Sequence, residues 1–254
     1  MKLATLASLG LLAAALGLGS AAHAATYYVS DCQAGADPKC VPGDDSESNK
    51  GLSPSTPWRT TAKVKSKFGG LAGSDKVLFA GGGVWVDAAM MLQNFNSSAA
   101  SPITFDSYAP AWGGTARPIL KQTDPEETVF SFSDGGEPDA DGGYVVQNLD
   151  LRGEGTGGSA VFTSQQIRDI TLRNPRIEGF EIGVYCGRAI ERIKLFDLVL
   201  VNNRGQGVLW ECASSSIEGN VFDNNGWKLP VYATRSTSTA MAAAPRTTSS
   251  ATTR

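Results

Sequence analysis

Four stretches of this chain follow one pattern: "VVQNLDLRG" from Val145, "TLRNPRIEG" from Thr171, "KLFDLVLVNN" from Lys194 and "SIEGNVFDNNG" from Ser216. Each has an apolar residue near its start, Asn, Asp or Gly in its middle, and an apolar residue near its end. The two apolar positions hold Val146 and Leu151, Leu172 and Ile177, Leu195 and Leu200, and Ile217 and Phe222. A pattern that recurs at a nearly constant period indicates a repeat architecture.

A second pattern follows each of these stretches. It reads "GSAVF", "EIGVY", "GQGVL" and "KLPVY", and it places valines at positions 161, 184, 208 and 231, which are 23, 24 and 23 residues apart. The units contain short strand-like runs that Gly, Asn and Asp interrupt, without a long stretch of helical period. Such coils have to stack, at about 4.8 Å per layer, to bury their apolar residues. The sequence therefore predicts an all-β fold, a parallel β-solenoid; an antiparallel sandwich is the alternative, but it gives no reason for one template to recur in register.

The N-terminus has the build of a secretory signal peptide. Residues 1–24 begin with Lys2, continue through the apolar run "LATLASLGLLAAALGLG" and end in Ala22, His23 and Ala24, an A-x-A cleavage site. The run is too short for a membrane span, and no second run of spanning length follows it. We therefore expect a secreted protein, extracellular or periplasmic, that is a monomer.

Cleavage of this peptide has a chemical consequence, because His23 is the only histidine of the chain. The mature protein then lacks Ser/His/Asp triads, Cys/His dyads and histidine general bases. Removal of Lys2 leaves 21 basic residues against 25 acidic ones, without a basic cluster. This balance argues against nucleic acid as a partner.

The four cysteines all lie after the signal peptide, in a chain sent to an oxidising compartment, where disulfides are expected. Of the three connectivities, we favour Cys32 with Cys40 and Cys186 with Cys212. Cys186 follows its valine by two residues and Cys212 follows the next valine by four, so the two lie near each other on adjacent coils. The layer spacing is within the Cα range that a disulfide allows.

The four repeats resemble those of secreted right-handed parallel β-helix proteins, the superfamily of pectate lyases and related polysaccharide enzymes. The N-terminal order "TYYVSD", "GDDSESNKGLSPSTPWRTTAKV", "DKVLFAGGGVW", "SPITFDSYA" and "RPIL" is also similar to that of many such proteins. The resemblance runs from about Thr26 to Tyr232. It implies a right-handed parallel β-helix domain over residues 25–232, in which a short strand, a loop and a capping helix precede the first coil.

The stretch "WRTTAKVKSKF" from Trp58 is expected to form this capping helix. Ser55 or Thr56 can cap its N-terminus and Pro57 suits its first turn. The residues expected to pack on the first coil are Trp58, Ala62 and Phe68. The preceding Gly/Asp/Ser loop is not a helix-loop-helix calcium site, since Lys50 occupies the glycine position and Thr56 the glutamate position. Its oxygens still suit a hard cation, so calcium in this loop stays an alternative.

The resemblance also implies a chemistry that needs no histidine. Lyases of this family use calcium, held by aspartates, to neutralise a uronate carboxylate, and a Lys or Arg to remove the proton α to it. In this sequence the candidate calcium ligands are Asp197, Asp223 and Asn224, and the candidate bases are Arg204 and Lys228. The alternative is structural, because Asn and Asp favour solenoid turns and form side-chain ladders.

Aromatic residues offer a second kind of candidate site. Phe162, Tyr185 and Tyr232 each follow an inward valine and should face outward, one coil above another, with Leu209 interrupting the series. A sugar ring could lie on such a strip, although simple cross-strand stacking also accounts for it.

Two functions remain open from the sequence. The first is lyase-like cleavage of an extracellular acidic polysaccharide, with calcium as cofactor. The second is a non-catalytic carbohydrate-binding or cell-surface scaffold protein, since a fold does not fix a function.

The repeat pattern stops after Tyr232. Residues 233–254 hold 17 Ala, Ser or Thr among 22 and no Val, Ile, Leu or aromatic residue. Such a segment cannot bury enough apolar surface to order itself, so we expect a low-complexity, disordered tail. A C-terminally truncated or frame-shifted member of the family would show the same abrupt change.

Overall fold

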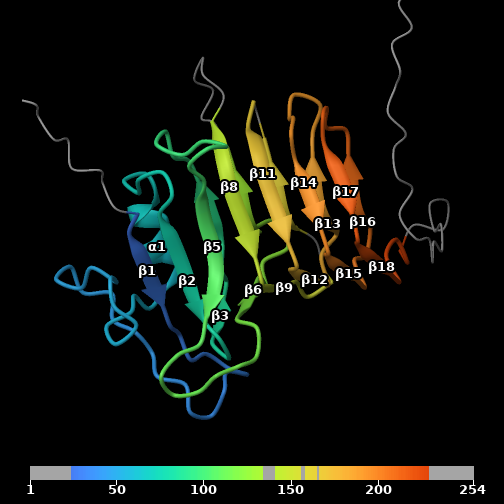
Figure 1. The fold of residues 1–254 in the computed structure, drawn as a ribbon. Helices are drawn as coiled ribbons and strands as arrows, with labels where there is room; N and C mark the ends of the chain where they lie inside the picture. Colours follow the sequence, from blue (N-terminus) through green and yellow to red (C-terminus); the bar gives the residue numbers. More distant parts are fainter. Residues whose placement is uncertain (1–23, 134–140, 156–157, 165, 229–254) are drawn as a thin grey trace, which may run out of the picture.

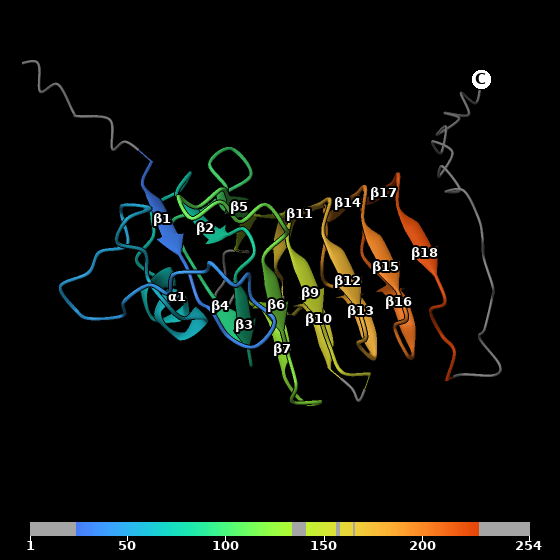
Figure 2. The ribbon, with the colours of Figure 1, turned by 90° about the horizontal axis from the view of Figure 1, so that it is seen from below.

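A computed structural model describes residues 24–133, 141–155, 158–164 and 166–228 of the chain. Apart from one helix, its regular elements are strands, which form three parallel sheets that run side by side along the molecule (Figures 1 and 2). We name them the first, second and third sheet, in the order in which the chain visits them within one coil.

The first sheet contains β1 (Thr26–Val29), β2 (Lys76–Ala80), β5 (Ile103–Tyr108), β8 (Gly142–Gln147), β11 (Arg168–Arg173), β14 (Lys194–Phe196) and β17 (Ser216–Glu218). The second contains β3 (Val84–Val86), β6 (Ile119–Lys121), β9 (Asp150–Arg152), β12 (Arg176–Glu178), β15 (Val199–Val201) and β18 (Val221–Asp223). The third contains β4 (Met90–Leu92), β7 (Thr128–Phe132), β10 (Ser159–Thr163), β13 (Ile182–Cys186) and β16 (Gln206–Trp210). This topology confirms the predicted parallel β-helix.

The register of the strands also agrees with the sequence repeats. The first apolar position aligns Val146, Leu172, Leu195 and Ile217, and the last aligns Leu151, Ile177, Leu200 and Phe222. Val161, Val184 and Val208 align in the third sheet, and Val231 lies outside the described residues. These residues are buried in the earlier coils and only partly buried at Val208, Ile217 and Phe222, in the last described coil.

The corner between the first and second sheets explains why Asn and Asp recur. Asn148, Asn174 and Asp197 occupy it in successive coils with φ of 57°, 56° and 59°, the left-handed region that these residues tolerate best. Asn174 Nδ2 donates to Asn148 Oδ1 at 2.9 Å, and Asn148 Nδ2 donates to Asp106 Oδ1 at 2.8 Å. At this corner the structural interpretation of the Asn/Asp pattern is confirmed.

The predicted capping helix is present as α1 (Thr61–Phe68), but it begins later than expected. Its N-cap is Thr60, whose Oγ1 accepts a hydrogen bond from Lys63 N at 3.1 Å, so the prediction of Ser55 or Thr56 was wrong. The reason is that Trp58 extends the first sheet: its N donates to Tyr28 O at 2.8 Å, and Val29 pairs with it.

The side chains that α1 buries also differ in part from the prediction. Trp58 and Phe68 are buried as expected, whereas Ala62 is exposed and Val64 takes its place. Phe68 stacks on Phe105 of β5 at 5.6 Å between ring centroids. The helix therefore closes the N-terminal end of the apolar core, which would otherwise be open to water.

Carboxylates of the loop before α1 hold this cap in place. Asp45 accepts from the Oγ1 of Thr60 and from Arg59 N at 2.7 Å, and Glu47 forms an ion pair with Lys63 at 2.9 Å. Hydrogen bonds from the hydroxyl and N–H of Ser46 lower the pKa of Asp44. The carboxylate oxygens of Asp44, Asp45 and Glu47 thus accept hydrogen bonds from donor groups of the protein itself.

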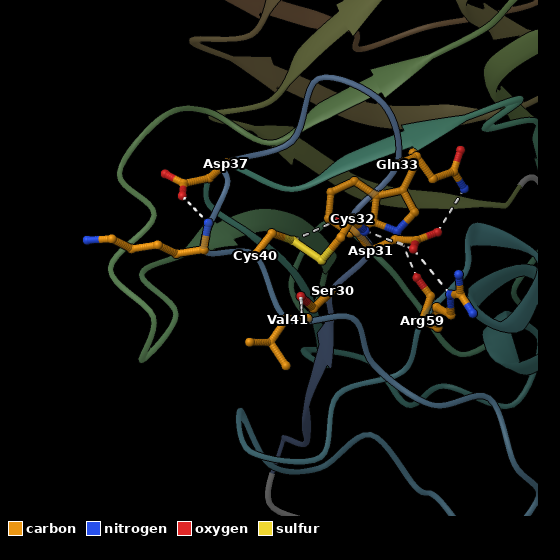
Figure 3. The surroundings of a disulfide bond; sticks show 10 residues. Ser30, Asp31, Cys32, Gln33, Asp37, Cys40, Val41 and Arg59 are labelled. Atoms are coloured by element: carbon orange, nitrogen blue, oxygen red, sulfur yellow. Dashed lines mark hydrogen bonds and ion pairs between the residues drawn. A yellow bond between two sulfur atoms is a disulfide. The ribbon is translucent and has the colours of Figure 1, made fainter.

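Both predicted disulfides are confirmed. Cys32 and Cys40 have a Cα–Cα distance of 5.6 Å, and Cys186 and Cys212 one of 5.7 Å. Figure 3 shows the first of them beside the buried Asp31, which accepts from Gln33 Nε2 and Arg59 Nε.

The interior near the N-terminal end is unusually rich in aromatic rings. Phe130 and Phe132 of β7 lie between Phe105 and Tyr144, with centroid distances of 5.1 Å for Phe105 to Phe130 and 4.8 Å for Phe132 to Tyr144. Burial raises the pKa of Tyr144 to about 12, so its hydroxyl stays neutral and donates to Asn94 O at 3.1 Å.

In the part of the chain described here, no helix is both long and apolar enough to cross a bilayer.

Candidate functional site

The outer face of the third sheet carries a column of side chains, one from each coil. In register along the solenoid these are Met91, Ser131, Phe162, Tyr185 and Leu209, and we call them the outer column. They alternate along their strands with buried residues, such as Phe130 and Phe132 on either side of Ser131, so they point away from the core. Met91 is the most exposed of them, at 67%.

Phe162 and Tyr185 form a stacked pair within this column. Their ring centroids are 4.7 Å apart and their planes differ by 10°. Leu209 follows Tyr185 in register, so the predicted arrangement is confirmed, whereas Tyr232 lies outside the described residues. Each ring packs one of its faces against the other ring. Its second face is directed along the column, that of Phe162 toward Ser131 and that of Tyr185 toward Leu209.

One border of this face is the corner at which the chain passes from the second sheet to the third. Lys228 N donates to Arg204 O at 3.1 Å, so the two predicted bases lie in adjacent coils, as expected. Arg204 Nε is 2.6 Å from Glu181 Oε2. A guanidinium has no free lone pair with which to accept a proton, so Arg204 is not suited to act as a base. The exposed Lys228 has no ion pair with any described residue.

The predicted calcium ligands do not all lie at this corner. Asn224 Nδ2 donates to Asn202 Oδ1 at 2.7 Å, and Asp223, the residue before Asn224, ends β18. In the preceding coil, however, the residue that pairs with Asp223 is Val201. Asp197 lies four residues before Val201, at the corner between the first and second sheets. In the next coil Asp197 N donates to Glu218 O at 3.0 Å, at the end of β17, so Asp197 adjoins a different part of that coil from Asp223.

Asp197 therefore cannot join Asp223 and Asn224 in one ligand set. Among the residues that the structure describes, no group of three or more His, Cys, Asp or Glu is arranged to hold a metal ion. A calcium requirement stays a prediction.

The other border is the corner between the third sheet and the first. Its ion pairs were not predicted from the sequence. Arg192 binds Asp169 through Nε at 2.7 Å and Nη2 at 2.9 Å, and these hydrogen bonds raise the pKa of Arg192. Arg188 Nε is 3.0 Å from Glu211 Oε2. In both pairs the partners are 23 residues apart, the period of the repeat. Opposite charges one repeat period apart were therefore the sequence signal that could have predicted these ion pairs.

No family model matches this chain, and no curated protein sequence matches it. Among solved structures, an alginate lyase from Paenibacillus sp. str. FPU-7 is similar at 13% identity and a TM-score of 0.45, over 66% of this chain and 65% of that one. The GH136 lacto-N-biosidase from Eubacterium ramulus is similar at 16% identity and a TM-score of 0.45, over 79% of this chain and 34% of that one. A rhamnogalacturonan lyase has 15% identity and a TM-score of 0.29, over 80% and 62% of the two chains.

The chain thus spans less than two thirds of the length of each of these proteins. Likenesses at such identities and TM-scores do not transfer an activity to this chain.

Proposed function

We propose that this chain is a secreted β-helix protein that binds extracellular polysaccharide along the outer face of its third sheet. The observation that carries the proposal is the stacked pair of Phe162 and Tyr185 within the outer column. Aromatic rings bury a large apolar area in a fixed geometry. A solenoid adds one equal step per coil, so it offers an elongated face with a regular repeat, which suits a polymer of regular repeat.

The secreted location is supported by the two disulfides, since such bonds persist mainly in oxidising compartments. The signal peptide predicted for residues 1–24 lies almost wholly outside the described residues.

Tyr185→Ala is expected to weaken binding of the recognised polysaccharide about tenfold, because the variant loses one ring and leaves Phe162 without its stacking partner. Affinity electrophoresis against a panel of acidic, neutral and basic polysaccharides identifies the ligand, and calorimetry measures its dissociation constant.

Phe196→Ala is the matched control, because Phe196 is a half-buried aromatic residue on the outer face of the first sheet. We expect this variant to keep the affinity of the wild type. Equal losses in the two variants would show that the third sheet is not the binding face.

The second candidate function is cleavage of an acidic polysaccharide by β-elimination. It is favoured by Lys228, an exposed amine on the border of the outer column without an ion pair to a described residue. In this reaction the neutral amine of Lys228 would take the proton α to a uronate carboxylate. The electron pair of that C–H bond forms a carbon–carbon double bond, and the glycosidic oxygen leaves and gains a proton. The guanidinium of Arg204, which lies 2.6 Å from Glu181, would attract the carboxylate.

Lys228→Ala is expected to abolish the release of unsaturated uronides from pectate or alginate, measured by ultraviolet absorbance, while the substrate remains bound. Lys194→Ala, an exposed lysine on the first sheet, is the control. Wild-type protein that binds these polymers without releasing unsaturated product would reject the lyase and leave the binding function. Activity that survives chelation would show that calcium is not required.

A further inference from the structure

A cavity of about 340 Å³ lies at the N-terminal end of the solenoid, where β1 and α1 are located (Figure 1). Three separate segments line it: Tyr27 of β1, residues between 47 and 58 in the loop before α1, and the end of α1 with the turn that follows it. Members of the outer column do not line it, so it is separate from the face described above. Its volume is at the lower end of the range for pockets that bind small ligands.

One wall of this cavity is aromatic. The rings of Tyr27 and Trp58 are stacked, with centroids 4.8 Å apart and planes that differ by 17°. Gly51 lies so close to the Trp58 ring that a Cβ added to it would be 2.7 Å from ring atoms, and Trp58 Nε1 donates to Asn49 O at 3.2 Å. The ring pair is therefore held in place by the protein, so a ligand would bind without the cost of ordering it.

Two leucines extend the apolar wall. Leu71 is buried, whereas Leu52 is 55% exposed although it lines the same cavity. A ligand ring seated here would cover apolar surface of Leu52, and removing such surface from water is favourable.

The rim of the cavity has an excess of positive charge. Lys50, Lys67 and Glu47 all line it. Glu47 is 2.9 Å from Lys63, which is not in the lining, and the hydrogen bond from Lys63 is the largest cause of the lowered pKa of Glu47. Lys67 is farther from this carboxylate, at 3.5 Å, and Lys50 donates to Glu47 O and has no ion pair to any described residue. The two lysines of the rim are therefore available to an anionic ligand.

These features discriminate between classes of ligand. A cation would be repelled by Lys50 and Lys67, and a neutral sugar would leave both lysines without a charged partner. Burial raises the pKa of Tyr27, so its hydroxyl stays uncharged and does not repel an anion. A sugar acid has both of the required parts, a ring that can pack on an aromatic side chain and a carboxylate that accepts hydrogen bonds from ammonium groups.

We propose that this cavity binds one uronate unit of an acidic saccharide, with the sugar ring against Tyr27 and Leu52 and the carboxylate between Lys50 and Lys67. The inference goes beyond the proposed function, because it concerns a second site that uses no residue of the outer column. It also names the class of ligand, an acidic sugar, from the charge of the rim.

An NMR titration with digalacturonate and with its methyl ester tests the class of ligand. The indole N–H signal of Trp58, which lines the cavity, reports binding at this site. The two ligands share their rings and differ in charge, and we expect the acid to bind about tenfold more tightly than the ester. Lys67→Met should weaken binding of the acid about fivefold, because methionine keeps an apolar side chain and lacks the charge. Lys50→Met is a second variant with the same expectation.

Lys65→Met is the matched control, because Lys65 is an exposed lysine of the same helix that does not line the cavity. It should leave the affinity unchanged, as should Tyr185→Ala on the outer column, and equal melting temperatures show that the variants fold. Equal effects of Lys67→Met and Lys65→Met, equal affinity for the acid and the ester, or an unchanged Trp58 signal would overturn the inference. Binding of a polysaccharide that depends on Tyr185 would still support the proposed function in each of these cases.

Discussion

Replacing Phe130 by alanine is expected to lower the free energy of unfolding by about 3–5 kcal/mol. Phe130 is fully buried in β7, and its ring lies 5.1 Å from that of Phe105 and 5.9 Å from that of Phe132. In the next coil toward the N-terminus, Met90 is its partner in register. Because these neighbours come from several coils, they cannot collapse into the space that the ring leaves.

Urea denaturation of the wild type and the variant measures this loss. Ser131→Ala is the control, since Ser131 is the next residue of the same strand and faces outward. It should change stability by less than about 0.5 kcal/mol. A larger loss for Ser131→Ala than for Phe130→Ala would mean that β7 presents the opposite set of side chains to the core.

Replacing Cys186 and Cys212 together by serine is expected to cost about 3.5 kcal/mol. The bond closes a segment with a sequence separation of 26 and joins adjacent coils, and the chain-entropy relation gives this value for a loop of that length. Cys32 and Cys40 are separated by only 8 residues, so removing their bond should cost less, about 2.5 kcal/mol.

Thermal and urea unfolding of the two double variants tests the order of these effects. A non-reducing digest of the wild type should yield a peptide that links Cys186 to Cys212. Recovery of both as free thiols, or a greater loss from the shorter loop, would contradict the prediction.

The sequence repeat was sufficient to predict the register of the β-helix, because a parallel coil returns each side chain to the same place one period later. Val161 and Val184 show this directly, since their spacing of 23 residues is also their pairing in the third sheet. The same rule shows that two of the predicted calcium ligands are not in register. Asp197 and Asp223 are 26 residues apart, and the residue paired with Asp223 is Val201, so the two aspartates occupy different positions of the coil.

The N-cap of α1 could not be predicted in this way. Thr60 caps α1 because Trp58 is drawn into the first sheet by Tyr28, a contact between residues 30 positions apart that no local pattern reveals.

The ion pairs between adjacent coils bear on the fidelity of folding. The apolar pattern is nearly the same in the four sequence repeats, so it does not distinguish one of these coils from the next. A chain that skipped one of them would still bury its valines and leucines. The pairs Asp169–Arg192, Glu181–Arg204 and Arg188–Glu211 differ in residue type and in position within the coil. A skipped coil would separate the partners of each pair. These ion pairs therefore favour the native order of the coils that they join over a stack in which one coil is missing.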